Sequence, residues 1–552
     1  MPLRVCLVSP FAWSLPHDVN EHVAGVAAGL RDLGHEVTVL APSTRAADLA
    51  AGRRALQQGA QPDVIAICPS LPVARRTHMG VPVGVRANLA HALANGRYDI
   101  VHGFEPGLPS LSYLALLHAE SLSVATFLSA ERLAYPPRRA QREKLLARVD
   151  ALLATSPETA AAACERFPGS YRVIAEGVDT ELFAPGPKRQ LAVLEWLPGE
   201  RPHVRAVERA LAARPGWELV LLRAGPGARP AVPRRLRDRV GVRTARDPAT
   251  RAAVLAEASL FVPALEGSER RRLEAAAAGA SLADTRLEPI GDTPPPPPED
   301  FAEVAATLDE TYAGLARRRR RRFQPEDPLS DREWIACDLH MHTHWSHDCS
   351  IAVPDLLDHA EEIGLGAIAV TDHNVFGGAR EAAELARRRK LIVIPGEEVK
   401  TGGQGEVIGL FLTDEIPRGM SFGDTIAAIR EQGGLVYVPH PFDRMHAIPE
   451  PATLHRHLAE IDLFEVYNAR LLFEAYNDEA VRFARKYNLT AGAGSDAHVL
   501  QGVGTGALRM RAFHGPEEFM LSLRTAEVLR RPKSLAYLQS LKWVAQVKEK
   551  VR

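Results

Sequence analysis

One short segment, from Asp338 to Asp348, combines histidine and aspartate side chains at a spacing that suits metal chemistry. It places His340 and His342 two residues apart, directly after the apolar, strand-like run Trp334-Ile-Ala-Cys. Alternate side chains of a strand point to the same side, so both imidazoles are expected to face one point. Two imidazoles beside carboxylates are typical of a transition-metal site, although this spacing alone is a weak indication.

Four further apolar runs downstream end in side chains of the same kind. These runs end in Thr371-Asp372-His373, Gly396-Glu-Glu398, His440-Pro and Ser495-Asp496-Ala-His498. In a β/α barrel the carboxyl ends of the strands gather on one face, where such sites are built. Packing alone does not explain five strand ends that each supply imidazole or carboxylate. We therefore predict a polynuclear metal site.

The motifs, in this order, resemble the PHP family, the polymerase and histidinol phosphatase domains, over about residues 334–525. The resemblance implies a distorted (β/α)7 barrel that holds two or three divalent ions, either manganese, zinc or iron. Carried over position by position, it implies metal ligands at His340, His342, Asp348, His373, Glu398, Glu406, His440, Asp496 and His498.

Two of these positions depart from the fullest form of the family pattern. Asp348 stands where some members have histidine, and the adjacent His347 is the alternative ligand. Glu406 stands where many members have histidine before Ile-Leu-Gly. A carboxylate still binds a hard or borderline ion, so a three-metal site remains open. The additional oxygen ligands favour manganese or iron over zinc.

Such a site favours phosphoester hydrolysis, because bridging ions acidify a shared water and clamp phosphate oxygens. Asp372 or His373 could hydrogen-bond behind the ligands or assist the leaving group. Asn468 and Arg470, which follow another strand-like run, could contact the substrate phosphate; the alternative is a strand-end cap and a solvated charge. We expect a small phosphorylated substrate, with a sugar phosphate as one candidate.

The 552 residues suggest two to four domains. Strand-like runs alternate with alanine-rich helical stretches, which predicts an α/β protein with doubly wound parallel sheets in the front half. Five prolines, a helical segment and six arginines then interrupt the pattern. The expected division is 1–180 and 181–290 as two Rossmann-like domains, 291–333 as a Pro/Arg-rich linker with a helix, 334–525 as the barrel, and 526–552 as a helical tail.

Residues 1–290 resemble the family-4 retaining glycosyltransferases, and most closely the phosphatidylinositol mannosyltransferases. The resemblance is carried by Leu33-Gly-His-Glu-Val-Thr-Val-Leu-Ala-Pro, Val101-His-Gly-Phe-Glu-Pro-Gly-Leu-Pro-Ser and Glu176-Gly-Val-Asp-Thr-Glu-Leu-Phe. It implies the GT-B-type fold of two facing Rossmann-like domains, with a sugar nucleotide between them. The family's E-x7-E pair is present as Glu266 and Glu274, which the resemblance implies in binding that cofactor.

Other parts of the transferase pattern are missing. Pro16-His-Asp-Val replaces a glycine loop that lets backbone amides approach phosphate, and Leu128 replaces a histidine. The Gly-Arg…Lys pair that neutralises the diphosphate has no match. We interpret the front half as a degenerate binding scaffold. Two alternatives remain: an active glycosyltransferase whose barrel domain is accessory, and a barrel in which metal only stabilises the fold.

Composition excludes several partner classes. The formal net charge of −1 provides no field for nucleic acid, and five scattered cysteines favour a reducing compartment. No apolar run approaches the ~20 residues of a membrane span, and the N-terminus reads as a strand, so we expect a cytoplasmic protein. Arg317 to Arg322 could touch anionic lipid weakly or form a solvated linker face.

Overall fold

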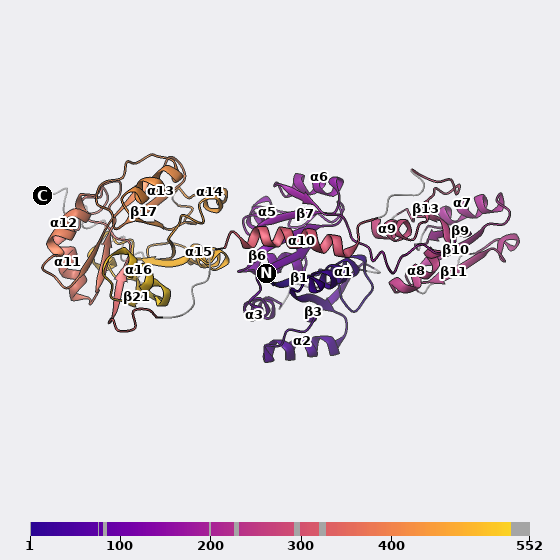
Figure 1. Cartoon of the computed structure of the whole chain (residues 1–552), viewed down its shortest axis with the longest axis horizontal. Coiled ribbons are helices and arrows are strands. Elements are labelled where there is room, and N and C mark those ends of the chain that lie inside the picture. The colour runs from indigo at the N-terminus through magenta and orange to yellow at the C-terminus, as the bar shows by residue number, and fades with distance from the viewer. Residues whose placement is uncertain are drawn as a thin grey trace. The chain divides into compact units, whose positions relative to one another are not determined.

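The computed structural model describes residues 2–74, 77–80, 85–197, 200–225, 231–265, 267–291, 298–319, 327–445 and 447–531. The chain forms two compact units, Met1–Ala316 and Arg317–Arg552 (Figure 1). The boundary falls inside the segment expected to be a linker. The finer domain boundaries stay predictions.

The first unit begins with an eight-stranded sheet in the order β4-β3-β2-β1-β5-β6-β7-β8. All neighbouring strands are parallel except β3 and β4. The strands are β1 Arg4–Val8, β2 Glu36–Ser43, β3 Val64–Ala74, β4 Thr77–Gly80, β5 Ile100–Phe104, β6 Leu122–Phe127, β7 Ala151–Ala154 and β8 Tyr171–Val173. The helices are α1 Asp18–Asp32, α2 Ala46–Gln58, α3 Arg86–Gly96, α4 Leu111–His118, α5 Arg139–Leu146 and α6 Pro157–Arg166. Central strands such as β5 and β6 are buried throughout, which explains their continuous apolar runs.

A second, five-stranded sheet of the first unit has the order β11-β10-β9-β12-β13 and is parallel throughout. Its elements are β9 Arg189–Glu195, α7 Arg201–Ala212, β10 Glu218–Arg223, η1 Arg234–Leu236, β11 Val240–Thr244, α8 Pro248–Ala256, β12 Ala258–Val262, α9 Glu269–Ala277 and β13 Ser281–Leu282. The two sheets confirm the α/β prediction of doubly wound parallel sheets for this half.

Helix α10, Phe301–Ala316, lies against α1 in the first unit (Figure 1). Its buried face includes Val304, Leu308 and Tyr312. The Tyr312 hydroxyl lies 2.6 Å from Nδ1 of the buried His102. The helix expected within the linker is therefore part of the first unit's core.

The second unit is one nine-stranded sheet in the order β20-β19-β18-β17-β16-β15-β14-β21-β22. The strands are β14 Trp334–Asp338, β15 Ala367–Val370, β16 Ile392–Lys400, β17 Glu406–Leu410, β18 Leu435–Val438, β19 Leu463–Asn468, β20 Thr490–Gly494, β21 Gly506–Arg511 and β22 Glu527–Arg530. Strands β14 to β20 run in one direction except β17, which is antiparallel to both neighbours.

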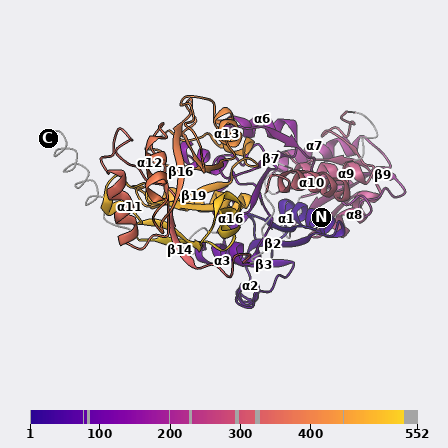
Figure 2. The same ribbon diagram turned by 60° about the vertical axis from the view of Figure 1, so that its left-hand side comes forward.

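These seven strands curl almost into a closed barrel, as predicted. The Leu339 amide donates to the Ala493 carbonyl at 3.3 Å, and Met341 forms a parallel bridge with Ala497, so β14 meets β20. The helices lie around the strands (Figures 1 and 2). They are α11 Val353–Glu362, α12 Gly377–Ala386, α13 Phe422–Glu431, α14 Pro451–Arg456, α15 Glu474–Tyr487, η2 Leu500–Gly502, α16 Gly515–Ser522 and η3 Leu523–Thr525.

The helical tail expected from residue 526 is wrong at its start. Residues 527–530 form strand β22, because they pair antiparallel with β21, with Val528 opposite Leu508. The rest of the expected tail, from 532, lies outside the described residues, as do Arg320, Arg321 and Arg322 of the arginine run.

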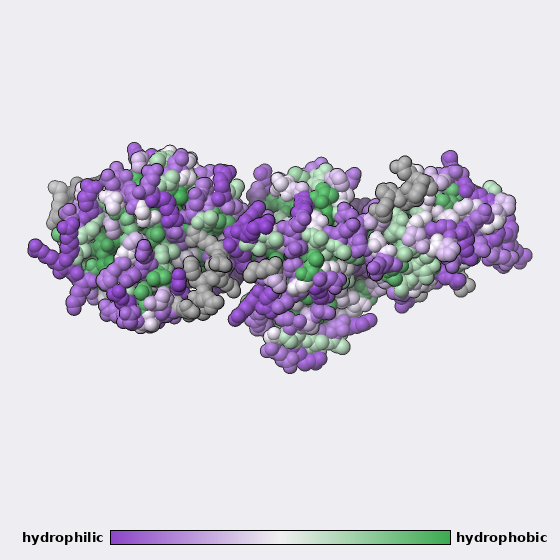
Figure 3. Space-filling view, viewed as in Figure 1, coloured by the Kyte–Doolittle hydropathy of each residue, from purple (hydrophilic) through white to green (hydrophobic). Residues whose placement is uncertain are grey.

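Among the described residues, no helix has the length and apolar character needed to cross a membrane. Polar and charged residues cover much of the visible face, with small apolar patches between them (Figure 3).

Candidate metal centre

The barrel brings all nine predicted ligands to one edge. Loops that follow the parallel strands β14, β15, β18 and β20 carry seven of them, and Glu398 lies near the end of β16. Glu406 is the first residue of β17 and pairs in register with Lys400, the last residue of β16. Because β17 runs antiparallel, its start lies at the same edge as the ends of the others.

The first group of ligands surrounds Glu398 and Asp496. Nε2 of His340 lies 3.3 Å from Oε2 of Glu398, and Nε2 of His342 lies 3.5 Å from the same oxygen. Nε2 of His342 is also 3.4 Å from Oδ1 of Asp496. Two imidazoles and two carboxylates therefore converge, each offering an atom of the kind that divalent ions bind.

A second group shares Glu398 from its other oxygen. Nε2 of His440 lies 2.9 Å from Oε1 of Glu398 and 3.6 Å from Oε2 of Glu406. Glu398 thus stands between two ligand groups, as a bridging carboxylate would.

The third group consists of Asp348, His373 and His498. Nε2 of His498 lies 2.9 Å from Oδ2 of Asp348, and Nε2 of His373 lies 3.8 Å from Oδ1 of Asp348. Asp348, preferred over His347 as a ligand, therefore lies beside two of the other predicted ligands. Nδ1 of His373 is 3.0 Å from Oε2 of Glu398, which joins this group to the other two.

The donor set fits bound cations. Nε2 of His342 is buried and makes no hydrogen bond among the described residues. Ligand atoms of His340, Glu398 and His440 lie within 4.8 Å of one another, as do those of His340, His342 and Asp496. Mixed imidazole and carboxylate donors suit manganese, iron or zinc. A buried polar atom without a hydrogen bond is costly, and a cation bound beside it would offset that cost.

The pKa values of the predicted ligands shift in both directions. Burial opposes protonation of His340, His373 and His440, but neighbouring carboxylates, Glu398 first among them, raise the pKa of each, so a cation bound there would displace protons. Burial lowers the pKa of His342 well below its usual value, and the neighbouring His498 and His373 lower it further. Burial opposes ionisation of Glu398, but His340 and His373 hold its pKa well below the usual range. Neutral imidazole and ionised carboxylate are the forms that bind metal.

Two ligands sit on strained backbone. His440 has φ of 26° and Asp496 has φ of 51°, both in the left-handed region that non-glycine residues avoid. Such strain is concentrated at functional sites, where the surrounding structure holds it in place.

Glu465 is a site residue that the sequence did not reveal. Its Oε1 lies 3.1 Å from Nδ1 of His340 and accepts from the Tyr437 hydroxyl at 3.0 Å. Its Oε2 accepts from the His440 amide at 2.6 Å and from the Asn468 side chain at 3.0 Å. Glu465 therefore orients His340 through the imidazole ring and His440 through the backbone amide. The only signal in the sequence is a glutamate inside an apolar strand, Leu463 to Tyr467.

Asp372 lies behind the ligands. Its Oδ1 accepts from the Thr343 amide at 2.7 Å and the Ser346 hydroxyl at 2.8 Å. The same hydroxyl lies 3.2 Å from Nδ1 of His342. These contacts support the predicted hydrogen-bonding role, while assistance to a leaving group stays a prediction.

Arg470 and Asn468 lie beside the ligand groups. Nη1 of Arg470 lies 3.1 Å from Oδ1 of Asp496 and 3.3 Å from Nε2 of His498. The Arg470 side chain keeps 27% of its surface exposed, so it faces both the site and solvent. Asn468 is buried and donates to Glu465 and Asp496, which makes it a structural support. A role for either residue toward substrate stays a prediction.

In the first unit, Glu266 lies outside the described residues and Glu274 is fully buried. Arg251 donates to both Glu274 oxygens at 2.7 and 2.8 Å, and Arg271 donates to one at 2.7 Å. The predicted cofactor contact of Glu274 is untested, but its oxygens already accept from two arginines.

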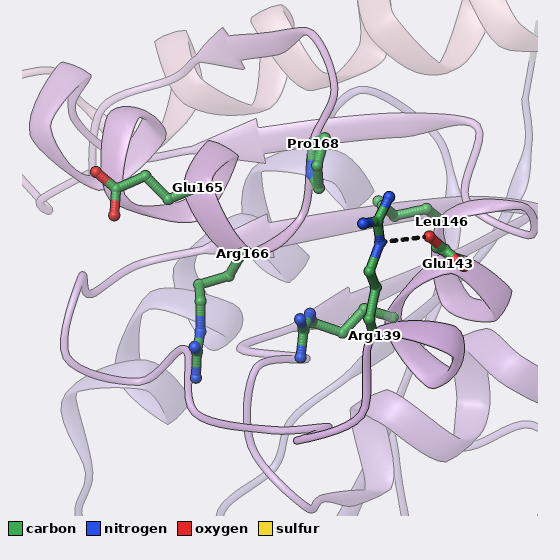
Figure 4. A pocket seen from close by; sticks show the side chains of 7 residues that line it. Arg139, Glu143, Leu146, Glu165, Arg166 and Pro168 are labelled. Atoms are coloured by element: carbon green, nitrogen blue, oxygen red, sulfur yellow. Dashed lines mark hydrogen bonds and ion pairs between the residues drawn. The ribbon is translucent and has the colours of Figure 1, made fainter.

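A separate surface pocket of about 520 Å³ lies beside α5 and α6 in this unit (Figure 4). It contains none of the predicted site residues. It is lined by Arg139, Arg142, Glu143, Leu146, Glu165, Arg166 and Pro168.

Replacing Glu465 by glutamine should weaken metal binding by about 10–100-fold. The substitution turns one carboxylate oxygen into an NH2 group, which cannot accept the hydrogen bond that the oxygen accepted. Manganese titration by calorimetry checks this. Tyr437→Phe removes only one donor to Glu465 and should have a much smaller effect. Equal affinities of wild type and Glu465→Gln would contradict the assignment.

Comparison with known proteins agrees with this geometry. Residues 338–462 match the PHP domain family, residues 474–528 the PHP-associated family, and residues 19–182 Glycosyltransferase Family 4.

Two relatives are each similar to part of the chain. An uncharacterised protein of Methanocaldococcus jannaschii is 33% identical over 211 residues, which are 36% of this chain and 84% of that protein. A phosphatidyl-myo-inositol mannosyltransferase of Propionibacterium freudenreichii is 30% identical over 239 residues, which are 42% of this chain and 60% of the relative.

Among solved structures, PsfC from Pseudomonas syringae aligns with a TM-score of 0.32 and 20% identity, covering 39% of this chain and 99% of PsfC. A likeness of this size carries no argument about function. The family matches lead to one conclusion: the second unit carries PHP and PHP-associated domains, and the first unit carries a glycosyltransferase family 4 domain.

Proposed function

We propose that the second unit is a metal-dependent phosphoesterase that hydrolyses a small phosphorylated substrate. The observation that carries the proposal is the convergence of nine imidazoles and carboxylates in three contiguous groups, with Arg470 beside them. The PHP family match supports the same reading. The substrate, its monoester or diester character and the identity of the ions are matters for experiment.

Each group of side chains has a distinct task in this proposal. Ions held by the nine residues would supply a water acidified toward neutrality and a positive field for phosphate oxygens. Arg470 donates to a phosphate oxygen and so fixes the orientation of the ester. Glu465 and Ser346 hold the rings of His340 and His342, so that their Nε2 atoms face the centre.

We propose two or three ions, with manganese or iron preferred over zinc. Four of the nine ligands are carboxylates, which favour harder ions than an all-histidine set does. Asp348 and Glu406 are two of these carboxylates, and they belong to different groups.

His440→Ala and Asp496→Asn should each lower manganese-dependent hydrolysis of an aryl phosphate by at least about 100-fold, because each removes a ligand from a buried group. Release of the aryl alcohol measures the rate. His359→Ala is the matched control, since His359 lies on α11 and contacts Glu362 rather than the centre. Wild-type rates in both ligand variants would contradict the proposal.

Chelation of the ions should lower the thermal stability of the second unit. A ligand at about 100 times its dissociation constant adds ~2.7 kcal/mol, which corresponds to roughly 5–10 °C for a unit of this size. Calorimetry with manganese and then with chelator measures the shift. The transition of the first unit should stay in place; an unchanged second transition would show that no stabilising ion is bound.

We infer that the first unit is a glycosyltransferase-like scaffold and not an active transferase. Three arginines, Arg251 of α8 with Arg270 and Arg271 of α9, contact four carboxylates. Arg251 contacts Glu21 at 2.6 Å and Arg271 contacts Asp18 at 2.7 Å. The set is completed by contacts of Arg270 with Glu176 and of Arg251 and Arg271 with Glu274.

These carboxylates already form ion pairs with the arginines that a diphosphate would need. Three positive and four negative side chains leave no net positive charge in the network, so a sugar nucleotide would have to displace an internal partner. Loss of the glycine loop removes backbone donors as well.

Calorimetric titration with a panel of UDP- and GDP-sugars should therefore give no binding at millimolar concentration. Glu274→Gln should lower the free energy of unfolding of the first unit by about 3 kcal/mol, because it removes a buried carboxylate that both Arg251 and Arg271 contact. Glu269→Gln, on the exposed side of α9, should change it little. Tight sugar-nucleotide binding that is lost in Glu274→Gln would favour the active transferase instead.

A further inference from the structure

The surface pocket beside α5 and α6, called here the α5–α6 pocket, lies in the first unit and holds more arginines than carboxylates. Arg139, Arg142 and Arg166 line it together with two glutamates (Figure 4). Its volume of about 520 Å³ falls within the range of small-molecule sites, ~300–1,000 Å³. Its size and its charge together indicate a small anionic ligand.

The walls of the pocket are fixed by the core beneath them. Leu145 of α5 and Phe167, directly after α6, are buried in the same hydrophobic cluster. The ring of Phe167 packs against Phe127 at a centroid distance of 5.2 Å. The lining residues Leu146 and Arg166 are the chain neighbours of these two core residues. Because both walls rest on one core, a ligand does not have to order them when it binds.

Arg142 has one edge of its guanidinium group available to a ligand. Nη1 donates to the carbonyls of Pro136 and Pro137 at 3.0 and 2.8 Å. The Tyr135 amide donates to the Gly107 carbonyl at 2.9 Å, and proline restricts φ, so both proline carbonyls are firmly placed. Nε and Nη2 of Arg142 make no hydrogen bond among the described residues. Together they present two parallel N–H donors, an arrangement that binds two oxygens of one phosphate or carboxylate.

The glutamates of the lining leave two of the arginines without a counter-charge. Glu143 pairs with Arg139 at 2.8 Å, and both side chains are exposed, so this pair is weak. Glu165 and Arg166 point in different directions (Figure 4). Within the part of the chain that the structure describes, neither Arg142 nor Arg166 forms an ion pair. Two such guanidinium groups on one pocket suit a ligand with two negative charges.

The surroundings of the pocket favour a soluble ligand over a lipid surface. Helices that lie in a membrane interface present large apolar side chains such as Trp, Phe and Leu. No large apolar side chain between residues 131 and 170, all of them described, is exposed. Leu146 is half-buried and packs against the core cluster. With Pro168 it offers a small apolar contact, enough for the organic part of a small molecule.

We propose that the α5–α6 pocket binds a small, soluble phosphate monoester. The Nε and Nη2 edge of Arg142 holds two phosphate oxygens, and Arg166 compensates the second charge. A monoester carries about two negative charges on one phosphorus near neutral pH, whereas a diester carries only one. A sugar nucleotide, whose diphosphate is esterified at both ends, is therefore a poor ligand here. The inference gives the first unit a ligand of its own and is independent of hydrolysis in the second unit.

Calorimetric titration of the full chain, with a chelator present to remove ions from the metal centre, tests the inference. Propyl phosphate should bind at least about tenfold more tightly than methyl propyl phosphate or butanoate, which carry one charge each. Arg142→Gln and Arg166→Gln should each lower the affinity for propyl phosphate by at least about fivefold. Arg142→Lys should restore little, because lysine supplies a charge without the two parallel donors.

Arg53→Gln is the matched control, since it removes the same charge from an exposed position on α2. Helix α2 packs against β3, whereas α6 packs against β7 and β8 at the other end of the sheet. The affinity for propyl phosphate should be the same in this variant as in wild type. Arg166 has no ion pair among the described residues, so Arg166→Gln still tests the inference if Arg142→Gln does not fold.

Several results would overturn the inference. They are equal affinities for the three compounds, an affinity that neither Arg142→Gln nor Arg166→Gln lowers, and an equal loss in Arg53→Gln. Vesicles that contain phosphatidic acid present the same monoester on a lipid. Binding to these vesicles without binding of propyl phosphate would assign the arginines to a membrane surface instead. None of these results bears on the phosphoesterase proposal, because the titration is made without its ions.

Discussion

The second unit depends on a carboxylate that is shut off from water. Glu398 is buried, yet its two oxygens lie within 3.5 Å of imidazole nitrogens from four histidines: His340, His342, His373 and His440. Burial of an isolated anion costs several kcal/mol, so the barrel must hold these rings at contact distance from several strand ends. The closure of β14 on β20 and the reversed direction of β17 serve that requirement, because each brings a ligand to the edge where Glu398 lies.

Most of the predicted ligands could be found from the sequence because they stand where an apolar run ends, whereas Asp348, in the loop after β14, and Glu406, at the start of β17, came from the family resemblance. Glu465 could not, because its partners His340 and His440 lie 125 and 25 residues away and a glutamate inside a strand carries no mark of them. The direction of β17 was also hidden, since a run of five residues that is buried almost throughout reads the same way along either direction. Likewise, helical spacing identified the segment 301–316 but could not show that α1 is its partner.

The two units differ in the partners that their charged side chains have. The first unit keeps parallel sheets with buried central strands, while its arginines face carboxylates of the same chain. The second unit keeps both the barrel and a set of ligands whose partners all lie at one edge. Because fold alone does not determine function, the charges at each site are what support the different functions proposed for the two units.

The packing of α10 decides where this chain can be divided for separate study. Gly25 and Gly29 of α1 leave room for Phe301 and Ala305, and a Cβ at Gly25 would stand 2.3 Å from the Phe301 ring. Dissection at the proline tract would strip this helix away, uncover an apolar trough along α1 and leave His102 without the Tyr312 hydroxyl. Dissection after Ala316 keeps the trough filled, so an autonomous first half ends there and not at the prolines.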